Sequence, residues 1–180
     1  PDHLRVKFQF MDNSYLIFKD IRKFGRIEIW HDLNHLAKKL GREPKECTVK
    51  YLQSNIKSRT RGIKSALLDQ SIIAGLGNIY TDEILWMTKI HPETPAGTLK
   101  PRYLKPLIHN MNHTLEKAIK GMGTTILNFS FESGQKGQYG NQLKIFGKQD
   151  QLCPRCGTLI KKIRVAQRGT YFCPECQKKR

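Results

Sequence analysis

The stretch CPRCGTLIKKIRVAQRGTYFCPEC, residues 153–176, decides how the C-terminal part of this chain folds. It contains two Cys-x2-Cys pairs separated by sixteen residues, Cys153 with Cys156 and Cys173 with Cys176. This spacing is typical of a four-thiolate zinc ribbon, in which each pair makes a tight turn that directs two sulfurs at one tetrahedral ion. Four thiolates leave no open coordination position, so we expect a single Zn²⁺ with a structural role.

Two redox-active Cys-x2-Cys motifs are the alternative, but such motifs normally open a helix in a βαβ unit, and the surrounding sequence lacks that pattern. Residues 159–167 and 170–172 are predicted to form a hairpin with Arg168 and Gly169 at its turn. A guanidinium there can bind two phosphate oxygens with fixed geometry. An ordinary solvated turn residue is the competing interpretation.

The first thirty residues have a β pattern. Apolar and polar residues alternate from Leu4 to Phe10, which predicts a strand with one buried face, and residues 15–18 and 26–30 are predicted to be further short strands. Three strands that start at the first residue make a thin sheet whose apolar side needs a partner layer. We therefore expect a missing N-terminal portion of this lobe.

Beyond Trp30 the apolar residues follow the period of helices. The longest predicted helix has a clear apolar stripe and stops before Gly121, a usual residue just past a helix end. The glycine-rich stretch that follows, including Ser133–Asn141, predicts a mobile surface loop, with an ordinary linker as the alternative. The predicted helices lie near residues 48–57, 63–73, 79–88 and 101–120.

The charge balance points to an anionic partner. The 180 residues include 32 Lys and Arg against 15 Asp and Glu, a formal net charge of +17. Each basic residue alone is more readily explained as a solvated surface group, but the total favours nucleic acid. The longest apolar runs, such as residues 15–18, fall far short of the roughly 18 residues that cross a bilayer. With no secretion signal either, we expect a cytoplasmic, nucleoid-associated protein.

A glycine-containing turn, Gly75-Leu76-Gly77-Asn78, lies between two predicted helices. Such a turn lets backbone amides approach a phosphate, and the start of a helix adds a partial positive charge at the same place. Asn78 is the predicted N-cap of the second helix. A tight inter-helix turn with no DNA contact explains the same residues equally well.

His109 and His113 are four residues apart on one predicted helix and could share a metal ion. No second pair or carboxylate completes that site, so we favour a surface or packing role. The sequence has no Ser-His-Asp signature, P-loop or paired carboxylates.

Several motifs occur here in one order, and their combination resembles the formamidopyrimidine-DNA glycosylase / endonuclease VIII family over residues from about 4 to 178. The resemblance implies an α+β chain. Its expected parts are a remnant of an N-terminal β-sandwich (1–30), a helix–two-turn–helix DNA-binding domain (31–122), a lesion-covering loop and linker (123–150) and a β-hairpin zinc finger (151–180). The motifs are Leu68-Asp-Gln70, Gly75-Leu-Gly-Asn-Ile-Tyr-Thr-Asp-Glu83, Ile90-His-Pro92, Gly123-Thr-Thr125, and the four-cysteine ribbon with Gln167-Arg-Gly-Thr170.

The resemblance also implies site residues. Asn78 and Arg168 would grip the phosphates beside an extruded nucleotide, and Arg168 would assist δ-elimination. The stretch Arg22-Lys23-Phe24 is similar to the family's Arg-x-Phe wedge, which fills the gap left by the flipped base. Residues 134–141 would cover the damaged base.

The wedge favours the oxidised-purine branch of the family. The implied function is excision of 8-oxoguanine and formamidopyrimidines from double-stranded DNA by a monomeric bifunctional DNA glycosylase and abasic-site lyase. The basic patch before the Leu-Asp-Gln motif differs from the family's pattern, and there Arg61 and Lys64 are the candidate DNA contacts.

One departure concerns the nucleophile. The family uses an N-terminal Pro amine followed by Glu and a short acidic apolar motif, whereas here Pro1 is followed by Asp2-His3 and a predicted strand. We therefore interpret Pro1 as a coincidence and expect the catalytic N-terminal segment to be missing and the chain alone to be inactive. The alternative function is a non-catalytic zinc-ribbon nucleic-acid-binding protein.

Overall fold

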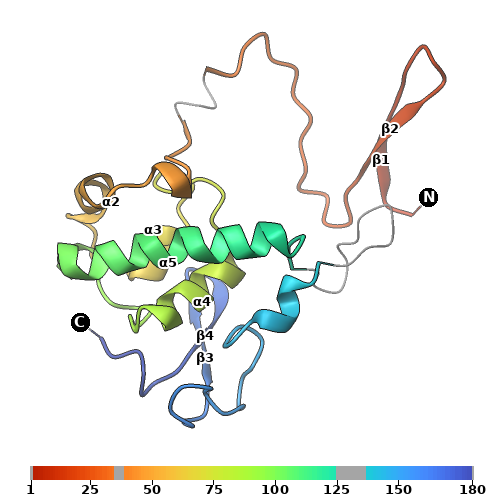
Figure 1. Ribbon diagram of the computed structural model, residues 1–180. Coiled ribbons are helices and arrows are strands. Elements are labelled where there is room, and N and C mark those ends of the chain that lie inside the picture. The colour runs from red at the N-terminus through yellow and green to blue at the C-terminus, as the bar shows by residue number, and fades with distance from the viewer. Residues whose placement is uncertain (1, 35–38, 125–136, 180) are drawn as a thin grey trace. The chain divides into compact units, whose positions relative to one another are not determined.

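The computed structural model describes residues 2–34, 39–124 and 137–179 (Figure 1). The chain forms two compact units, Pro1–Asn34 and His35–Arg180. Helices and two separate two-stranded sheets make it an α+β protein, as predicted. In the described residues, even the longest helix is too polar to span a membrane.

The first unit is built on an antiparallel hairpin of β1 (Leu4–Gln9) and β2 (Tyr15–Lys19). Its turn is stabilised by the Asp12 carboxylate, which accepts hydrogen bonds from the backbone and hydroxyl of Ser14 at 2.9 and 2.6 Å. The strand predicted over residues 26–30 does not form, because no strand of the unit's described residues pairs with this segment.

The second unit has a helical core. Its elements are η1 (Pro44–Glu46), α2 (Val49–Ile56), α3 (Ile63–Leu67), α4 (Asn78–Met87), η2 (Ala96–Thr98), α5 (Pro101–Lys120) and η3 (Tyr139–Gln142). The apolar stripe predicted for α5 is confirmed for Leu104, Leu107 and Met111, which are at most 1% exposed in the centre of this core. Ile119, which was predicted to belong to the same stripe, is 76% exposed near the end of the helix. Hydrophobic burial of these side chains holds α2 and α4 against α5.

Helix α3 is shorter than the predicted helix over 63–73. The Asp69 carboxylate accepts hydrogen bonds from the backbone and hydroxyl of Ser71, at 3.0 and 2.6 Å. This local side-chain bonding competes with the helical backbone pattern and begins the two turns that lead to α4.

The C-terminal hairpin consists of β3 (Lys161–Val165) and β4 (Arg168–Phe172). Its turn is at Ala166 and Gln167, whose φ values of 48° and 57° match the twist-compatible two-residue turn of hairpins. The predicted turn at Arg168 and Gly169 was therefore wrong by two residues. Arg168 begins β4, pairs with Val165 and is exposed.

Candidate nucleic-acid interface

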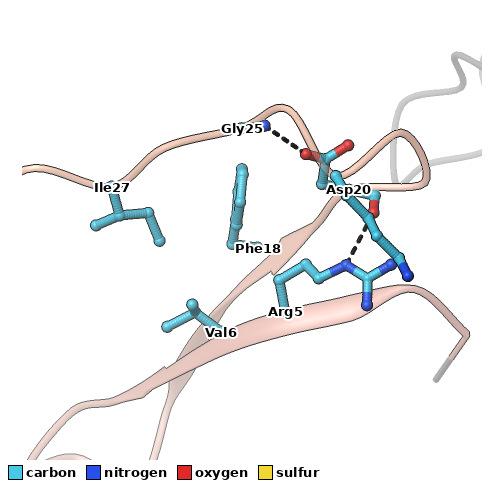
Figure 2. Close-up of a pocket in the computed structure, with 7 residues that line it drawn as sticks. Arg5, Val6, Phe18, Asp20, Gly25 and Ile27 are labelled. Carbon is cyan, nitrogen blue, oxygen red and sulfur yellow. Dashed lines mark hydrogen bonds between the residues drawn. The ribbon is translucent and has the colours of Figure 1, made fainter.

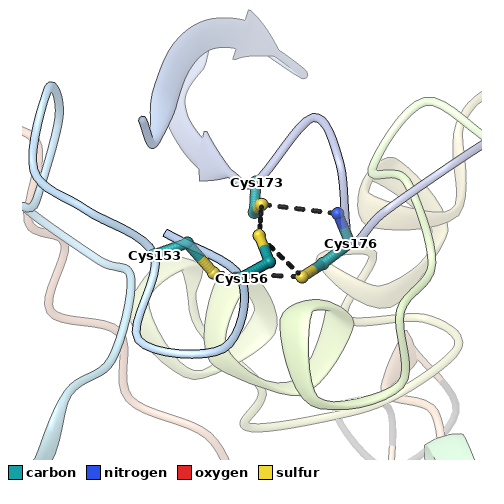
Figure 3. Close-up of side chains that lie close together, drawn as sticks. All are labelled: Cys153, Cys156, Cys173 and Cys176. Atoms are coloured by element: carbon teal, nitrogen blue, oxygen red, sulfur yellow. Dashed lines mark hydrogen bonds between the residues drawn. The ribbon is translucent and has the colours of Figure 1, made fainter. Parts of the chain in front are cut away.

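The four ribbon cysteines converge on one point (Figure 3). All four sulfurs lie within 4.8 Å of one another, and Cys156 Sγ is 3.4 Å from both Cys173 Sγ and Cys176 Sγ. A tetrahedral zinc ion with bonds of about 2.3 Å requires sulfur separations of about 3.8 Å. The donor set and its spacing thus fit one structural Zn²⁺, confirming the prediction.

Helix α4 carries the contacts that hold this ribbon. The buried Trp86 indole donates to Cys153 Sγ at 3.4 Å, and the Arg155 guanidinium lies over the Trp86 ring at 4.1 Å. Arg155 Nη1 also donates to the Trp86 carbonyl at 2.9 Å. A donated hydrogen bond stabilises a metal-bound thiolate, so the helix supports the zinc site directly.

The Glu83 carboxylate forms a second connection. It is 2% exposed and accepts three backbone hydrogen bonds, at 2.8 to 2.9 Å, from residues 144, 145 and 146. These charge-assisted bonds fix the backbone that enters the ribbon. Nothing local in the sequence predicted this role, because the partners are about 60 positions away.

A buried ion pair forms the third connection. Lys64 of α3 and Asp82 of α4 both have fully buried side chains, with Nζ 2.6 Å from Oδ1. Lys64 also donates to Thr170 Oγ1 at 2.8 Å and to the Gly169 carbonyl at 3.3 Å. Asp82 Oδ2 accepts from the Tyr171 amide at 2.9 Å. Both charged groups therefore hold residues 169–171 of β4, which directly follow Arg168.

Burial dominates the electrostatics of this pair. It lowers the pKa of Lys64, against the attraction of Asp82, and it raises the pKa of Asp82 to about 6. The nearby Arg168 charge lowers the pKa of Lys64 further. Lys64 has no exposed surface in this structure, because its ammonium is enclosed by these partners. The side chain that was predicted to contact DNA is therefore turned towards these partners and does not face solvent.

Asn78 lies where α4 meets the ribbon. It is the first residue of the helix, and Gly77 is the N-cap, so the prediction of an Asn78 cap was wrong. Its amide instead donates from Nδ2 to the Gly169 carbonyl at 3.1 Å. Its Oδ1 is buried and has no hydrogen-bond partner among the described residues. The helix start and the residue after Arg168 are thereby held together.

The backbone of the turn before α4 is accessible to a ligand, because no other group among the described residues covers it at Gly75 and Gly77. The Gln70 side chain bridges it, accepting from the Gly75 amide at 2.8 Å and donating to the Leu76 carbonyl at 3.1 Å. Gly75 has a φ of +85°, which favours glycine, and no atom lies within 4 Å of the Cβ position of Gly75 or Gly77. An anion can therefore approach the free amides at the start of α4 closely.

Arg61 lies before α3 and stays partly exposed. Its guanidinium bonds the Asp69 carboxylate, which also lies 3.5 Å from Arg59. The pKa of Asp69 is lowered to about 2. The hydrogen bond from the Ser71 hydroxyl is the main cause, and the hydrogen bond from Arg61 lowers the pKa further. The pair anchors the first turn, while 40% of the Arg61 side chain remains available to solvent.

Arg22 and Phe24 lie in the first unit, on a turn organised by Asp20. Figure 2 shows the Asp20 carboxylate bonded to the Gly25 amide. The Asp20 carboxylate accepts from the Arg22 amide at 2.9 Å and the Gly25 amide at 2.6 Å, and the Gly25 bond is the main cause that lowers the pKa of Asp20. The Arg22 guanidinium lies 5.1 Å from the centre of the Phe24 ring, which is 74% exposed. The turn thus presents a cation and an aromatic ring together.

The remaining predicted features are only partly described. In the stretch predicted as a mobile loop, residues 133–136 lie outside the described residues, and Gln138 hydrogen-bonds the Gly121 carbonyl at 2.9 Å. The rings of His109 and His113 stack with centroids 6.2 Å apart. Among the described residues, the four cysteines are the only group of three or more potential metal ligands that come together.

Fold and site together define a chain in which a helical core, with two turns between α3 and α4, carries a four-cysteine zinc ribbon. Residues 40–130 match the family model "Formamidopyrimidine-DNA glycosylase H2TH domain", and residues 150–179 match "Zinc finger found in FPG and IleRS". The chain belongs to the formamidopyrimidine-DNA glycosylase family.

Similar proteins support this membership. Formamidopyrimidine-DNA glycosylases of Pediococcus pentosaceus and Ligilactobacillus salivarius are 43% and 45% identical over 181 residues, which cover 97% of this chain and 66% of each relative. The Lactococcus lactis FPG in two solved complexes, a mutant with a Fapy-dG containing DNA and a complex with an abasic site containing DNA, is 40% identical. Their TM-scores are 0.89 and 0.88, covering 99% of this chain and 68% of theirs. The chain thus spans about two thirds of its relatives' length.

Proposed function

We propose that this chain is the DNA-gripping part of a base-excision enzyme that removes oxidised purines, 8-oxoguanine and formamidopyrimidines, from duplex DNA and cleaves the resulting abasic site. Support comes from relatives named formamidopyrimidine-DNA glycosylase and from similar structures solved with Fapy-dG, abasic-site and carbocyclic 8-oxo-G containing DNA. The strongly basic composition, with a net charge of +17, suits such a partner. The protein would act as a monomer on nucleoid DNA.

One observation carries the proposal, the hydrogen bond from Asn78 to the Gly169 carbonyl. It fixes the open amides of the α4 start beside the strand that begins with Arg168. Amides and a helix N-terminus bind one phosphate, and a guanidinium binds the next with two parallel bonds. We propose that they hold the backbone on either side of an extruded nucleotide, with Arg61 as an outer contact and Arg168 assisting δ-elimination.

The Arg22–Phe24 turn would supply the wedge. Extruding a nucleotide costs a few kcal/mol of unstacking, which an inserted aromatic ring offsets in part. The exposed Phe24 ring and the Arg22 cation beside it suit this role, since the cation can hydrogen-bond the base left unpaired. We further propose that the chain is divided into a β lobe, a helix–two-turn–helix domain, a lesion-covering linker and a zinc finger.

We propose that the chain alone binds DNA without cleaving it, because Pro1 is followed by Asp2 and His3 and not by the Glu and the acidic apolar motif that follow the family's nucleophile. Incubation with an 8-oxoguanine duplex and borohydride tests this. A covalent product trapped on Pro1 would contradict the proposal.

Binding is tested separately by comparing the affinity of the chain for an abasic-site duplex, an undamaged duplex and an RNA of equal length. Lesion selectivity comes from a wedge and a clamp, whereas backbone charge gives none. We expect the abasic duplex to bind at least about tenfold more tightly. Equal binding to all three would favour a generic zinc-ribbon nucleic-acid-binding protein.

A further inference from the structure

A second basic surface lies in the helical unit, apart from the proposed clamp, which consists of the α4 start at Asn78, Arg168 and the outer contact Arg61. It is a groove of about 570 Å³ between α2 and the segment from η2 to the start of α5. Figure 1 shows α2 beside this end of α5. Lys50 and Lys57 line one wall and Lys100 lines the other, and all three side chains are exposed. None of them takes part in an ion pair among the described residues.

The segments that form the walls contain no acidic residue. Residues 47–68 and 94–115 hold five and three Lys or Arg respectively, and neither segment holds Asp or Glu, although the whole chain has 15 acidic residues in 180. Carboxylates from other elements neutralise three of these cations, through Asp69 for Arg59 and Arg61 and through Asp82 for Lys64. The groove lysines have no such carboxylate partner among the described residues, so they can bind an external anion.

The floor of the groove is rigid. The Gly97 amide donates to the Arg59 carbonyl at 3.0 Å, and a Cβ on Gly97 would lie only 2.5 Å from the Lys57 carbonyl oxygen. Ile56 and Leu99, 1% and 3% exposed, lie beneath. The start of the 20-residue helix α5 adds its partial positive charge to the same end. A fixed concave surface of one charge concentrates the field on an anion.

The groove is also connected along the chain to the proposed clamp. Lys57, Arg59 and Arg61 follow one another on the loop from α2 to α3, and Arg61 binds Asp69 at the first of the two turns. Gln70 then holds the open turn before Asn78. We infer that this groove, formed by Lys50, Lys57 and Lys100, binds the sugar-phosphate backbone of duplex DNA outside the lesion. The inference rests on the proposed DNA binding and extends it to a second, lesion-independent contact.

The test compares two triple variants of the full chain. Lys50→Ala/Lys57→Ala/Lys100→Ala removes the groove charges. Lys117→Ala/Lys120→Ala/Lys144→Ala removes two exposed lysines at the opposite end of α5 and the exposed Lys144, which lines the same pocket as Lys117. Affinity for a 25-base-pair duplex, undamaged or with an abasic site, is measured at several salt concentrations. Zinc content and circular dichroism confirm folding.

For the groove variant we expect a loss on the order of tenfold or more, equal for both duplexes, and a salt slope smaller by about 2 to 3. The control variant should change the slope by less than about 1. Equal effects of the two variants, or no effect of either, would overturn the inference.

In the unaltered chain, the Ser54 and Gly97 amide resonances should shift when undamaged duplex is added. If they respond to poly-glutamate and not to DNA, the groove serves a protein partner and the inference fails.

These results separate the two proposals. An unaltered chain that does not prefer abasic over undamaged duplex contradicts the proposed function. A chain that keeps this preference, with no difference between the triple variants, contradicts only the groove.

Discussion

The zinc ribbon and the Arg22–Phe24 turn are both proposed to touch DNA, but they are supported in opposite ways. The ribbon is fixed to α4 by buried groups, including the Lys64–Asp82 pair, Glu83 and Trp86. The turn is held by one exposed carboxylate, Asp20, and presents a ring that is 74% exposed. A phosphate grip needs groups held in fixed positions, whereas a wedge needs a large apolar side chain that is free to insert.

Zinc removal should have the largest effect, and it should affect the zinc ribbon but not the unit that carries the Arg22–Phe24 turn. Structural zinc contributes about 10–16 kcal/mol of apparent binding free energy in small domains. We expect a chelator to disorder residues 150–178 and to abolish tight DNA binding, while α5 and the β1–β2 hairpin keep their structure. Amide NMR spectra with and without chelator measure this. Loss of the hairpin signals would show that the two regions are coupled.

Lys64→Met should be the most damaging single substitution considered, because it leaves Asp82 buried without its partner. Breaking a buried ion pair costs about 3–5 kcal/mol, whereas replacing both partners with apolar groups is often nearly neutral. Urea unfolding should therefore show a large loss for Lys64→Met and a much smaller one for Lys64→Met/Asp82→Leu. If the double variant is as unstable as the single one, then Thr170 and Gly169, and not the ion pair, explain the burial of Lys64.

Acid should weaken the anchor of the first turn. The pKa of Asp69 is lowered from 3.8 to about 2, so its contribution is complete above about pH 4 and is lost as pH falls towards 2. Its side chain is 23% exposed, and we expect about 1 kcal/mol after allowing for solvent screening. The stability advantage of the unaltered chain over Asp69→Asn should shrink across this range in urea unfolding. A constant difference would contradict the assignment.

Phe24→Ala should change folding stability least, within about 0.5 kcal/mol, because the ring is exposed. The preference of this variant for abasic over undamaged duplex should nevertheless fall about tenfold, since the wedge is lost. Ile29→Ala, at a position 97% exposed in the same unit, is the matched control and should alter neither quantity. A similar loss of preference in the control would remove the reason for assigning the wedge to Phe24.

Local patterns predicted much of this molecule. The cysteine spacing located the metal site, and the apolar period located α5, because both depend on residues close in sequence. The predicted strand over 26–30 was wrong because a strand depends on a partner, and none is present in the described part of its unit. The hairpin turn was misplaced because Ala166 and Gln167, neither a usual residue for positive φ, form it.

The contacts that connect ribbon and helix could not be predicted in this way. Lys64 meets Thr170 across 106 positions, and Glu83 meets Ile145 across 62. A signal was present in α4, where Asp82 and Glu83 directly precede buried apolar residues. Charged residues at such positions need partners, but the sequence does not say which. The prediction that Asn78 caps the helix was wrong for the same reason, since its side chain donates a hydrogen bond to the distant Gly169 carbonyl.

The proposed clamp is tested most directly by a double-mutant cycle, in which Asn78→Ala, Arg168→Ala and the double variant are compared for binding to an abasic-site duplex. Because Asn78 positions the strand that carries Arg168, each substitution should weaken binding at least about tenfold, and the two should be coupled by about 1 kcal/mol or more. Strictly additive losses, or unchanged affinity in either single variant, would contradict a shared grip on one DNA backbone.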